Sequence, residues 1–558
     1  MAETFLHRLV RTGALEQAEK EYHRLRLDRD TSSEDIMALG GRLMKARALE
    51  ATGATRMALA RSAAEGYETA YKRTGGSYSG INTAALYLVA GDRPLASHIA
   101  QDLLRSLEGR QPRPGREAYH HVATQAEAQL ILGRQKQASC LLADAIALWP
   151  HDYADHASTL HQFDMLLEAL DAPHDWLDPF RPPKSLHFAG HLFGIGDAAG
   201  ALEPSSIHML ESAINDLLVD ENIGAAYGAL AAGADILIAE LLLSKGVELH
   251  VVQPCPDSLF VEHSIQPYGE AWLPRFKACL KAASSVRHVS TDDSLSDDLT
   301  TAFASETAMG LAVLRADLLA TEAVQLLMWD GTTHGGPAGT ARDAALWKKA
   351  GRRQIVVPAS FERPERDRPA VQTSGRTLKA MLFADVAGFG RLSERQVPLF
   401  LEHILAPLAA CCEARRDAIT HVNTWGDGLF MVFETVEAAA AAAVDLQQCF
   451  LGIDLDTVGL PPHLALRVAG HYSPVHLLQD PFLTQAGFFG REVTTAARIE
   501  AVTTPGSIFV SEPFACALAI SGGATFRCEP LKEKLSCRDR GDLTLFTLRR
   551  TKASVPAG

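Results

Sequence analysis

Two aspartates in the last third of the chain have the residue type and the setting of metal ligands. Asp385 lies in the run Leu382–Phe389, where an apolar segment of strand type ends on a carboxylate and a glycine-containing turn follows. Asp427 lies between two glycines where Ile419–Trp425 meets Leu429–Phe433, which is a strong hairpin signal. An aspartate at a strand end beside one at a hairpin tip would give two hard oxygen ligands. Mg²⁺ takes only one or two protein carboxylates and completes its shell with water and phosphates, and two such ions can activate an attacking oxygen and neutralise a triphosphate.

The elements around these aspartates must bring them together. The strand Thr377–Asp385 leads into the turn, whose backbone N–H groups can point at phosphate oxygens because glycine permits a close approach. A helix is expected over Glu394–Arg416, before the hairpin. The elements expected after the hairpin are the helix Val436–Phe450, the strand Leu464–Ala469 and a helix that begins near Thr494. This order predicts an α+β domain with a ferredoxin-like core of β-α-β-β-α-β type.

Four sequence blocks carry a resemblance to a known family. They are Phe383–Phe389, Gly426–Gly428, Gly490–Glu500 and Pro505–Ser511. In this order they resemble the class III nucleotidyl cyclases, the adenylate and guanylate cyclases, over about Thr377 to Leu548. The resemblance implies an enzyme that converts a nucleoside triphosphate to a 3′,5′-cyclic nucleotide and pyrophosphate, with ATP as the default substrate.

The resemblance also implies the roles of particular residues. Asp385, Asp427 and the carbonyl of Val386 would hold two Mg²⁺ or Mn²⁺ ions, and the turn residues Gly388 and Phe389 would contact the substrate. One ion would lower the pKa of the ribose 3′-hydroxyl and the other would hold the triphosphate, so that the 3′-oxygen attacks the α-phosphorus in line. The site of this family lies between two domains, so a single such domain implies a homodimer with two sites.

Four positions of the second half of the site agree with or depart from the family pattern. Arg498 matches the arginine that stabilises charge on the α-phosphate, for which a guanidinium suits phosphate best. Thr494 stands where the family has a transition-state asparagine; its hydroxyl can donate one hydrogen bond, so activity is expected to be reduced without being lost. Asn423 and Gly487 occupy the two base-reading positions and match neither purine code. A pyrimidine cyclase of phage defence, making cUMP or cCMP, and a nucleotide-binding receptor or scaffold of weak activity are therefore the alternatives.

The composition of the whole chain restricts its class. A chain of 558 residues with 47% hydrophobic and 22% charged residues is expected to form two to four globular domains. The net charge of −14 argues against a general partner for nucleic acid or an anionic membrane. The sequence has neither an apolar run of transmembrane length nor the apolar core of a signal peptide, and its nine cysteines are scattered, so we expect a cytoplasmic protein.

Residues 1–172 contain a helical repeat. Glycines recur at intervals of 38 to 42 residues, and an alanine follows each of them by five positions; the pairs are Gly13 and Ala18, Gly53 and Ala58, Gly91 and Ala96, and Gly133 and Ala138. The glycine is expected to end one helix and the alanine to let the next helix pack closely. The offsets resemble the tetratricopeptide repeat, which implies a concave surface for a protein partner. A helical module that only dimerises or braces the enzyme is the alternative.

Residues 184–360 alternate strand and helix signals. Strands are expected at Leu186–Ala189, Val247–Val252, Val324–Trp329 and Gln354–Val357, with helices between them, which predicts a parallel, doubly wound sheet. Ligands of such sheets bind beyond the carboxyl ends of the strands. The candidate ligand residues there are Gly190, Gly233, Asp235, Gly339 and Thr340. Their segments resemble the Rossmann-like nucleotide-sensing domains of the SLOG superfamily, which implies a nucleotide-like ligand; a purely structural sheet is the alternative.

Two linkers divide the chain into three predicted domains. The linkers Ala172–Lys184 and Phe361–Gly375 separate a tetratricopeptide-like repeat at 1–172, a Rossmann-like domain at 184–360 and a cyclase domain at 372–550. We expect a signalling enzyme whose two N-terminal modules sense a partner and a ligand and set the activity of the cyclase domain. A middle domain that is itself a nucleotide hydrolase is a further possibility.

Overall fold

The computed structural model describes most of the chain. The described residues are 6, 9, 10, 14–27, 33–195, 201–292, 297–332, 338–359, 375–482, 485–522, 525–537 and 541–551. Gly13, part of the glycine-rich segments after Phe188 and Trp329, and the predicted linker after residue 360 fall outside these ranges. The chain divides into two compact units, one with the described residues up to Pro182 and Leu318–Ala320, the other with those of Pro183–Asp317 and Thr321–Arg550. Both predicted sheet domains lie in the second unit.

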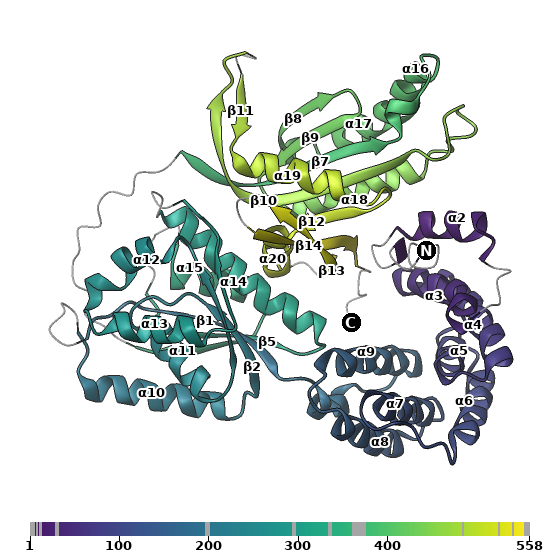
Figure 1. Ribbon diagram of the computed structural model, residues 1–558, viewed down its shortest axis with the longest axis horizontal. Coiled ribbons are helices and arrows are strands. Elements are labelled where there is room, and N and C mark those ends of the chain that lie inside the picture. Colours follow the sequence, from purple (N-terminus) through teal and green to yellow (C-terminus); the bar gives the residue numbers. More distant parts are fainter. Residues whose placement is uncertain are drawn as a thin grey trace. The chain divides into compact units, whose positions relative to one another are not determined.

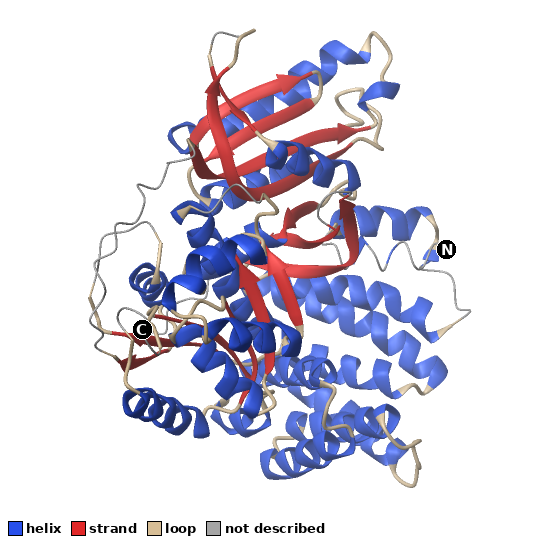
Figure 2. Ribbon diagram, turned by 60° about the vertical axis from the view of Figure 1, so that its left-hand side comes forward, coloured by secondary structure: helices blue, strands red, loops and turns tan. Residues whose placement is uncertain are grey.

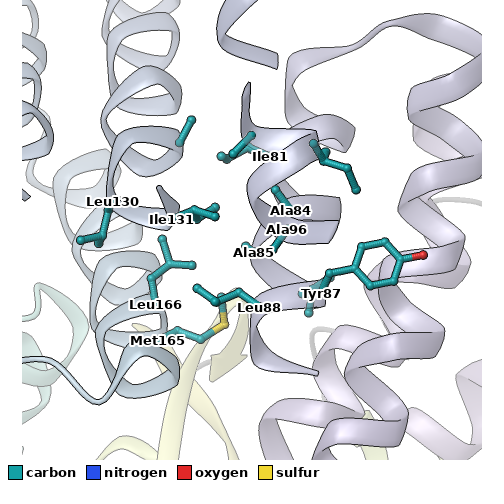
Figure 3. Close-up of a cluster of buried hydrophobic side chains, with 14 of the residues drawn as sticks. Ile81, Ala84, Ala85, Tyr87, Leu88, Ala96, Leu130, Ile131, Met165 and Leu166 are labelled. Carbon is teal, nitrogen blue, oxygen red and sulfur yellow. The ribbon is translucent and has the colours of Figure 1, made fainter. Parts of the chain in front are cut away.

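The N-terminal unit is helical in its described residues (Figures 1 and 2). Its helices are α2 (Leu15–Arg24), α3 (Glu34–Glu50), α4 (Gly53–Thr74), α5 (Ser77–Val89), α6 (Arg93–Leu107), α7 (Arg116–Ile131), α8 (Gln135–Leu148) and α9 (Tyr153–Leu170), followed by the 3₁₀ turn Asp175–Phe180. Side chains cap several of them: Ser33 accepts a hydrogen bond from the backbone N–H of Ile36, and Asp92 does the same for Leu95. Figure 3 shows apolar side chains of α5, α7 and α9, such as Leu88, Leu130 and Leu166, packed together in the core.

The predicted glycine–alanine repeat holds at two of its positions and fails at a third. Gly91 and Gly133 follow α5 and α7 with φ of 83° and 75°, and Ala96 and Ala138 are fully buried in the next helix. Gly53 instead is the first residue of α4, and its alanine partner Ala58 is exposed. The expectation for this alanine was wrong because α4 begins at the glycine, so that the buried face of the helix starts with Ala60.

The middle of the chain forms a six-stranded parallel sheet, as the sequence predicted. Its strands are β1 (Lys184–Gly190), β2 (Ile223–Gly228), β3 (Glu248–Gln253), β4 (Ser285–His288), β5 (Ala323–Trp329) and β6 (Gln354–Pro358), in the spatial order β4-β3-β2-β1-β5-β6. The strand order reverses direction between β1 and β5, which makes the carboxyl ends of these two strands the topological switch point. Sequence analysis missed β2, which lies in a Gly/Ala-rich segment, and the short, exposed strand β4.

Helices cover both faces of this sheet. They are α10 (Pro204–Val219), α11 (Ala234–Ser244), α12 (Asp257–Ser264), α13 (Trp272–Ala282), α14 (Asp298–Leu318) and α15 (Thr340–Lys349), with a 3₁₀ turn at Gln266–Tyr268. Residues of α10 to α13 pack with one set of strand side chains, including Phe188 and Leu326. Residues of α14 and α15 pack with the other set, including Tyr227 and Val252. This is the two-faced burial that an all-parallel sheet requires.

The C-terminal part forms a mixed sheet of eight strands. These are β7 (Arg376–Ala387), β8 (Ile419–Trp425), β9 (Gly428–Phe433), β10 (Ala465–Gln479), β11 (Ala486–Phe489), β12 (Ile508–Ser511), β13 (Phe526–Cys537) and β14 (Gly541–Arg550). Seven run in the order β13-β14-β12-β10-β7-β9-β8, and β11 pairs with the end of β10. The antiparallel pair β7–β10 forms the centre of the sheet, with Asp385 directly opposite Arg467.

The helices of this part are α16 (Gln396–Phe400), α17 (Ala406–Glu413), α18 (Val436–Leu451), α19 (Arg491–Val502) and α20 (Glu512–Ile520). A π-helical turn at Leu401–Leu405 joins α16 to α17, and 3₁₀ turns occur at Phe389–Arg391 and Arg416–Ala418. The predicted helix Glu394–Arg416 is thus one helical segment with a π turn at its centre. The core under the sheet includes Leu382, Phe433 and the buried alanines of α18. The predicted α+β architecture is confirmed, and the second half of the sheet was not anticipated.

Candidate active site

The two predicted metal ligands lie side by side. Asp385 is near the end of β7, and Asp427 is at the tip of the β8–β9 hairpin; the pairing of Ala384 with Leu429 brings the strand end and the hairpin tip together. The two carboxyl groups share a hydrogen bond, and the carboxyl group of Asp427 also accepts one from the backbone N–H of Val386. The structure therefore assembles the two carboxylates that the sequence singled out.

This proximity changes the acidity of Asp427. Partial burial is the largest cause, and the hydrogen bond and the negative charge of Asp385 add to it, so that the pKa of Asp427 rises to about 6. Hydrogen bonds from backbone N–H groups oppose the shift but do not reverse it. Two carboxylates this close repel each other when both are ionised, and a positive charge placed between them would relieve that repulsion.

Arg467 supplies a positive charge to one of the two carboxylates, that of Asp385. Its guanidinium forms an ion pair with Asp385 from the facing position on β10, and its Nε lies 3.0 Å from Oε1 of Glu500 on α19. Burial raises the pKa of Glu500, the positive charge of Arg467 opposes that rise, and Asp385 adds to it. Sequence analysis missed both residues. The signal for Arg467 was a single basic residue inside an apolar strand, but only the β7–β10 register places it opposite Asp385.

The turn after Asp385 has a shape that depends on glycine. Gly388 has φ of 99°, a left-handed conformation, and a Cβ added there would lie 3.1 Å from the side chains of His463 and Leu464. Phe389 begins the following 3₁₀ turn and packs its ring 4.7 Å from that of Phe400. The turn is thus held by an aromatic contact and its bend depends on glycine; that it binds phosphate stays a prediction.

The two predicted base-reading positions lie on β8 and β11, which are not adjacent in the sheet. Asn423 is half-buried on β8, where its side-chain oxygen accepts a hydrogen bond from the N–H of Thr424 at 2.9 Å. Gly487 is buried on β11, opposite Leu478 of β10. Ring contact between His421 and Phe488, 5.9 Å apart, joins β8 to β11. This ring contact brings part of β8 close to part of β11. The predicted base-reading position on β8 carries an amide side chain, and the one on β11 carries no side chain.

Thr494 and Arg498 share one exposed face of α19. They are one turn of helix apart, whereas Thr495, Ala496 and Ile499 form the buried face. The α19 helix begins after Gly490, whose φ of 136° only glycine adopts readily. Glu500, two residues beyond Arg498, points to a different side of the helix and meets Arg467. Both predicted catalytic residues are thus exposed to solvent rather than buried in the core.

The predicted ligand residues of the middle sheet lie in two places, between β1 and α11 and at the start of α15. Gly190 ends β1, and a Cβ there would lie 2.3 Å from Cβ of Ala234; Gly233, with φ of 103°, opens α11. Asp235 is buried in the first turn of α11, where its carboxyl group accepts hydrogen bonds from the N–H groups of Ala231 and Gly190. Burial raises its pKa to about 8. These contacts tie β1 to α11, so Asp235 stabilises the fold at this edge.

The remaining two candidates open α15. Gly339 has φ of 109° and precedes Thr340, the first residue of α15. Asp343 in the same turn is 4% exposed, and its Oδ2 accepts a hydrogen bond from Ser305 at 2.5 Å. Burial raises the pKa of Asp343 to about 6, against the bond from Ser305. Sequence analysis missed Asp343, although an acidic residue in the first turn after a glycine-rich segment is a recognisable signal.

A contact between a histidine and an aspartate lies at the switch point itself. His191 Nε2 is 3.0 Å from Oδ1 of Asp330, so the residues that follow β1 and β5 meet across the reversal in strand order. Burial alone would raise the pKa of Asp330, but hydrogen bonds from Thr332 and His191 outweigh it and hold that pKa below its usual value. Neither residue was anticipated. Within the part of the chain that the structure describes, there is no group of three or more histidine, cysteine or acidic side chains arranged to hold a metal.

Comparison with known proteins identifies two segments of the chain. Residues 374–550 match the family model of the Adenylate and Guanylate cyclase catalytic domain, and residues 3–87 match that of the Tetratricopeptide Repeats-Sensor. A curated relative, Putative adenylate cyclase 3 of Rhizobium meliloti (strain 1021), is 31% identical over 152 residues, which is 26% of this chain and 24% of the relative. The chain thus matches about a quarter of that relative's length.

Solved structures of cyclases are similar to about a third of the chain. The guanylate cyclase domain of RhGC from Catenaria anguillulae, in complex with GTP, is 20% identical and covers 31% of this chain and 97% of its own, with a TM-score of 0.27. The adenylyl cyclase CyaB from P. aeruginosa is 17% identical and covers 32% of this chain and 96% of its own, with a TM-score of 0.27.

The search for membrane-spanning segments was negative for the described residues, because none of their helices combines the length and the apolar character that a bilayer requires. The family-model match agrees with the sequence blocks and with the paired aspartates. Residues 374–550 thus form a domain of the adenylate and guanylate cyclase catalytic family, and residues 3–87 match the Tetratricopeptide Repeats-Sensor family.

Proposed function

We propose that the chain converts a nucleoside triphosphate to a 3′,5′-cyclic nucleotide and pyrophosphate with the help of two divalent cations. The observation that carries this proposal is the Asp385–Asp427 pair on the central strand and the adjacent hairpin of the cyclase domain. The pair lies beside a glycine-dependent turn, in a segment that matches the cyclase family.

The donor set fits Mg²⁺ or Mn²⁺. Both ions prefer oxygen ligands, and the two carboxyl groups, which lie close enough to share a hydrogen bond, support a cation bound between them. Asp385, Asp427 and the carbonyl of Val386 would hold the ions. When bound, the ions supply Lewis-acid activation of the ribose 3′-hydroxyl and neutralisation of the triphosphate.

The remaining steps use side chains and backbone of this chain. The backbone of the turn at Gly388 binds phosphate oxygens, which orients the triphosphate for in-line attack. Arg498 stabilises the negative charge that grows on the α-phosphate, and the hydroxyl of Thr494 donates a hydrogen bond in the same region. Arg467 pairs with Asp385 before substrate binds. Once cations bind Asp385, the guanidinium of Arg467 is free to pair with a phosphate of the substrate instead.

The complete site needs a second copy of the cyclase domain. Thr494 and Arg498 lie on an exposed helix face, away from the core, as expected for residues that complete a site on another subunit. Large apolar side chains are exposed on the strands β8, β10 and β11 and on the loop between the last two; they are Val422, Trp425, Leu477, Leu478, Phe482 and Phe489. Such a concentration of exposed apolar side chains is typical of an interface between proteins. We propose a homodimer whose two cyclase domains cover these side chains.

ATP is the default substrate, and a pyrimidine triphosphate is the alternative. Asn423 presents an amide with both a donor and an acceptor, and Gly487 presents no side chain, so neither position excludes a smaller base. A middle-domain ligand of nucleotide type, bound at the carboxyl edge of the parallel sheet, and a protein partner on the helical repeat complete the proposal.

The deciding experiment is a turnover assay of the purified full-length chain. ATP, GTP, CTP and UTP are supplied separately with Mg²⁺ and then with Mn²⁺, and products are resolved by mass. A cyclic product from one nucleotide establishes both the activity and the base. Nucleotide binding without product in either metal would contradict the proposed reaction and support a receptor, which the ion pair of Arg467 with Asp385 and the threonine at position 494 also favour.

A further inference from the structure

The middle sheet and the cyclase sheet are joined by α14, which packs against both. On one side, Ala308 and Ala312 of α14 belong to the same buried cluster as Tyr227 and Val252 of the parallel sheet. On the other, a Cβ added to Gly310 would lie 2.3 Å from Cα of Cys516 on α20, so the two helices touch backbone to backbone. A single missing side chain therefore permits this close approach.

Polar contacts fix α14 to the two central strands of the cyclase sheet. Arg376, at the start of β7, donates to Oδ2 of Asp297 at 3.0 Å and to the hydroxyl of Thr300 at 3.2 Å. Tyr472 of β10 donates its hydroxyl to Oε2 of Glu306 at 3.1 Å, and its ring lies 6.1 Å from that of Phe303. These strands are the same ones that carry Asp385 and Arg467.

Glu306 connects this contact to the opposite side of α14. Its other carboxylate oxygen pairs with Arg342 in the first turn of α15, and the neighbouring Ser305 donates to Asp343 in the same turn. Two adjacent residues of α14 thus hold two adjacent residues of α15. Glu306 is 7% exposed, so its charge depends on these partners rather than on water.

The first turn of α15 carries polar atoms that still lack partners. Among the described residues, Oδ1 of Asp343 and Nη1 of Arg342 have no hydrogen-bond partner, and both atoms are buried; Asp343 as a whole is 4% exposed. They follow Gly339 and Thr340 at the edge of the sheet where parallel folds bind ligands. An acceptor and a donor left unpaired at that edge are the groups that a polar ligand would satisfy.

We propose that Glu306 is a positioning residue that couples occupancy of the α15 edge to the cyclase site, through the chain of contacts Arg342–Glu306–Tyr472 and strand β10. Tyr472 and Arg467 are five residues apart on this strand, and Arg467 is opposite Asp385. A shift of the first turn of α15 pulls on Glu306, and Glu306 holds the hydroxyl of Tyr472. The strand transmits that shift because a packed sheet moves as a rigid element.

The coupling rests on the proposed cyclase reaction for its effect on turnover, but its structural part is testable without any reaction. The main variant is Tyr472→Phe, which removes one hydroxyl and keeps the ring. The matched control is Tyr87→Phe in the helical repeat, which removes an equivalent hydrogen bond to Glu68, 3.0 Å long, in the other compact unit.

The first readout is hydrogen exchange of the full-length chain. Tyr472→Phe is expected to speed amide exchange in α15, residues 340–349, by about three- to tenfold, although the substituted residue lies in the cyclase sheet. The control leaves α15 unchanged. Faster exchange confined to the cyclase sheet, with α15 as in the unsubstituted protein, overturns the proposal whether or not the protein makes a cyclic nucleotide.

The second readout is steady-state turnover with the nucleotide that gives product. Tyr472→Phe is expected to lower kcat by about three- to tenfold and to leave KM within about twofold, because the residue acts on the geometry of β10 and not on substrate contacts. Arg342→Lys, which cannot keep the same paired geometry, is expected to lower kcat in the same way from the other side of Glu306. A kcat within about twofold of the unsubstituted protein for both variants overturns the coupling.

The two readouts separate this proposal from the proposed function. If no nucleotide gives product but α15 responds to Tyr472→Phe, the reaction assignment fails and the coupling stands. If product forms and neither readout responds, the reaction stands and Glu306 serves only to hold the two sheets together.

Discussion

Asp427 in the cyclase sheet and Asp235 and Asp343 in the middle sheet all have a raised pKa, but they differ in how far their sites are open to solvent. In the middle sheet, burial raises the pKa of Asp235 to about 8 and that of Asp343 to about 6. Nearby negative charges add to both rises, and hydrogen bonds from N–H and O–H groups oppose them. In the cyclase sheet, burial is joined by the close negative charge of Asp385, and the pKa of Asp427 rises to about 6.

Exposure decides what each pair can do. The side chain of Asp385 is 24% exposed, whereas Asp235 and Asp343 are 7% and 4% exposed. A cation that arrives with part of its water shell can reach the first pair, because Mg²⁺ gives up its water reluctantly. The middle pair has no such access in the described structure. Of these raised pKa values, only that of Asp427 therefore lies at a pair that a hydrated cation can reach.

The largest expected effect comes from neutralising the cyclase pair. Asp385→Asn and Asp427→Asn should each lower turnover by at least about 100-fold in Mg²⁺, because direct ligands matter more than the outer-shell groups whose loss already costs ten- to a hundredfold. Asp235→Asn should leave turnover within about threefold. Initial rates of cyclic nucleotide formation check all three. If Asp235→Asn lowered turnover as much as Asp385→Asn, the aspartates of the middle sheet would matter for the reaction as much as those of the cyclase sheet.

The acidity of Asp427 predicts how metal binding depends on pH. A cation binds the ionised pair, so Mn²⁺ affinity should fall about tenfold per pH unit below pH about 6 and level off above it. Calorimetric titration of the full-length protein with Mn²⁺ between pH 5 and 8 measures this. Asp427→Asn removes the titrating group, so the residual affinity should lose this pH dependence. An unchanged slope in that variant would assign the proton to another group.

The free energy of unfolding should depend on pH through Asp235 of the middle sheet. A carboxyl whose pKa is raised in the folded state stabilises the fold below its unfolded pKa, and this contribution is lost as pH rises through the folded value. For Asp235 the window runs from about pH 4 to about pH 8. Asp235→Asn should therefore be close to neutral at pH 4 and more stable than the unsubstituted protein by about 2–3 kcal/mol at pH 6, because about two pH units of the window have then passed. Urea unfolding at the two pH values checks this. Equal stability differences at both would mean that Asp235 titrates normally.

The sequence predicted those parts of the molecule that local patterns encode. The apolar strand ending on Asp385 and the Gly-Asp-Gly hairpin predicted two candidate metal ligands that the structure places side by side, because each of these aspartates is contiguous with its strand or turn in the chain. Strand β2 was missed because glycine and alanine give it no strand propensity, although its neighbours bury it. The roles of Arg467, Glu306 and Asp343 depend on sheet register and on packing between distant segments. No local pattern contains that information.

The smallest expected effect concerns Thr494. It tests whether a threonine at this position makes kcat lower than an asparagine would. A threonine hydroxyl can donate one hydrogen bond, whereas an asparagine amide can donate two from a longer side chain. Because Thr494 is exposed on α19 one turn from Arg498, Thr494→Asn introduces no clash with the core. We expect it to raise kcat by about three- to tenfold with little change in KM, since the added contact forms mainly in the transition state. Thr494→Ala is the matched comparison and should lower kcat by a similar factor. If the two variants have equal turnover, position 494 does not contact the reacting phosphate, and the charge on the α-phosphate is left to Arg498 and the metal-binding pair.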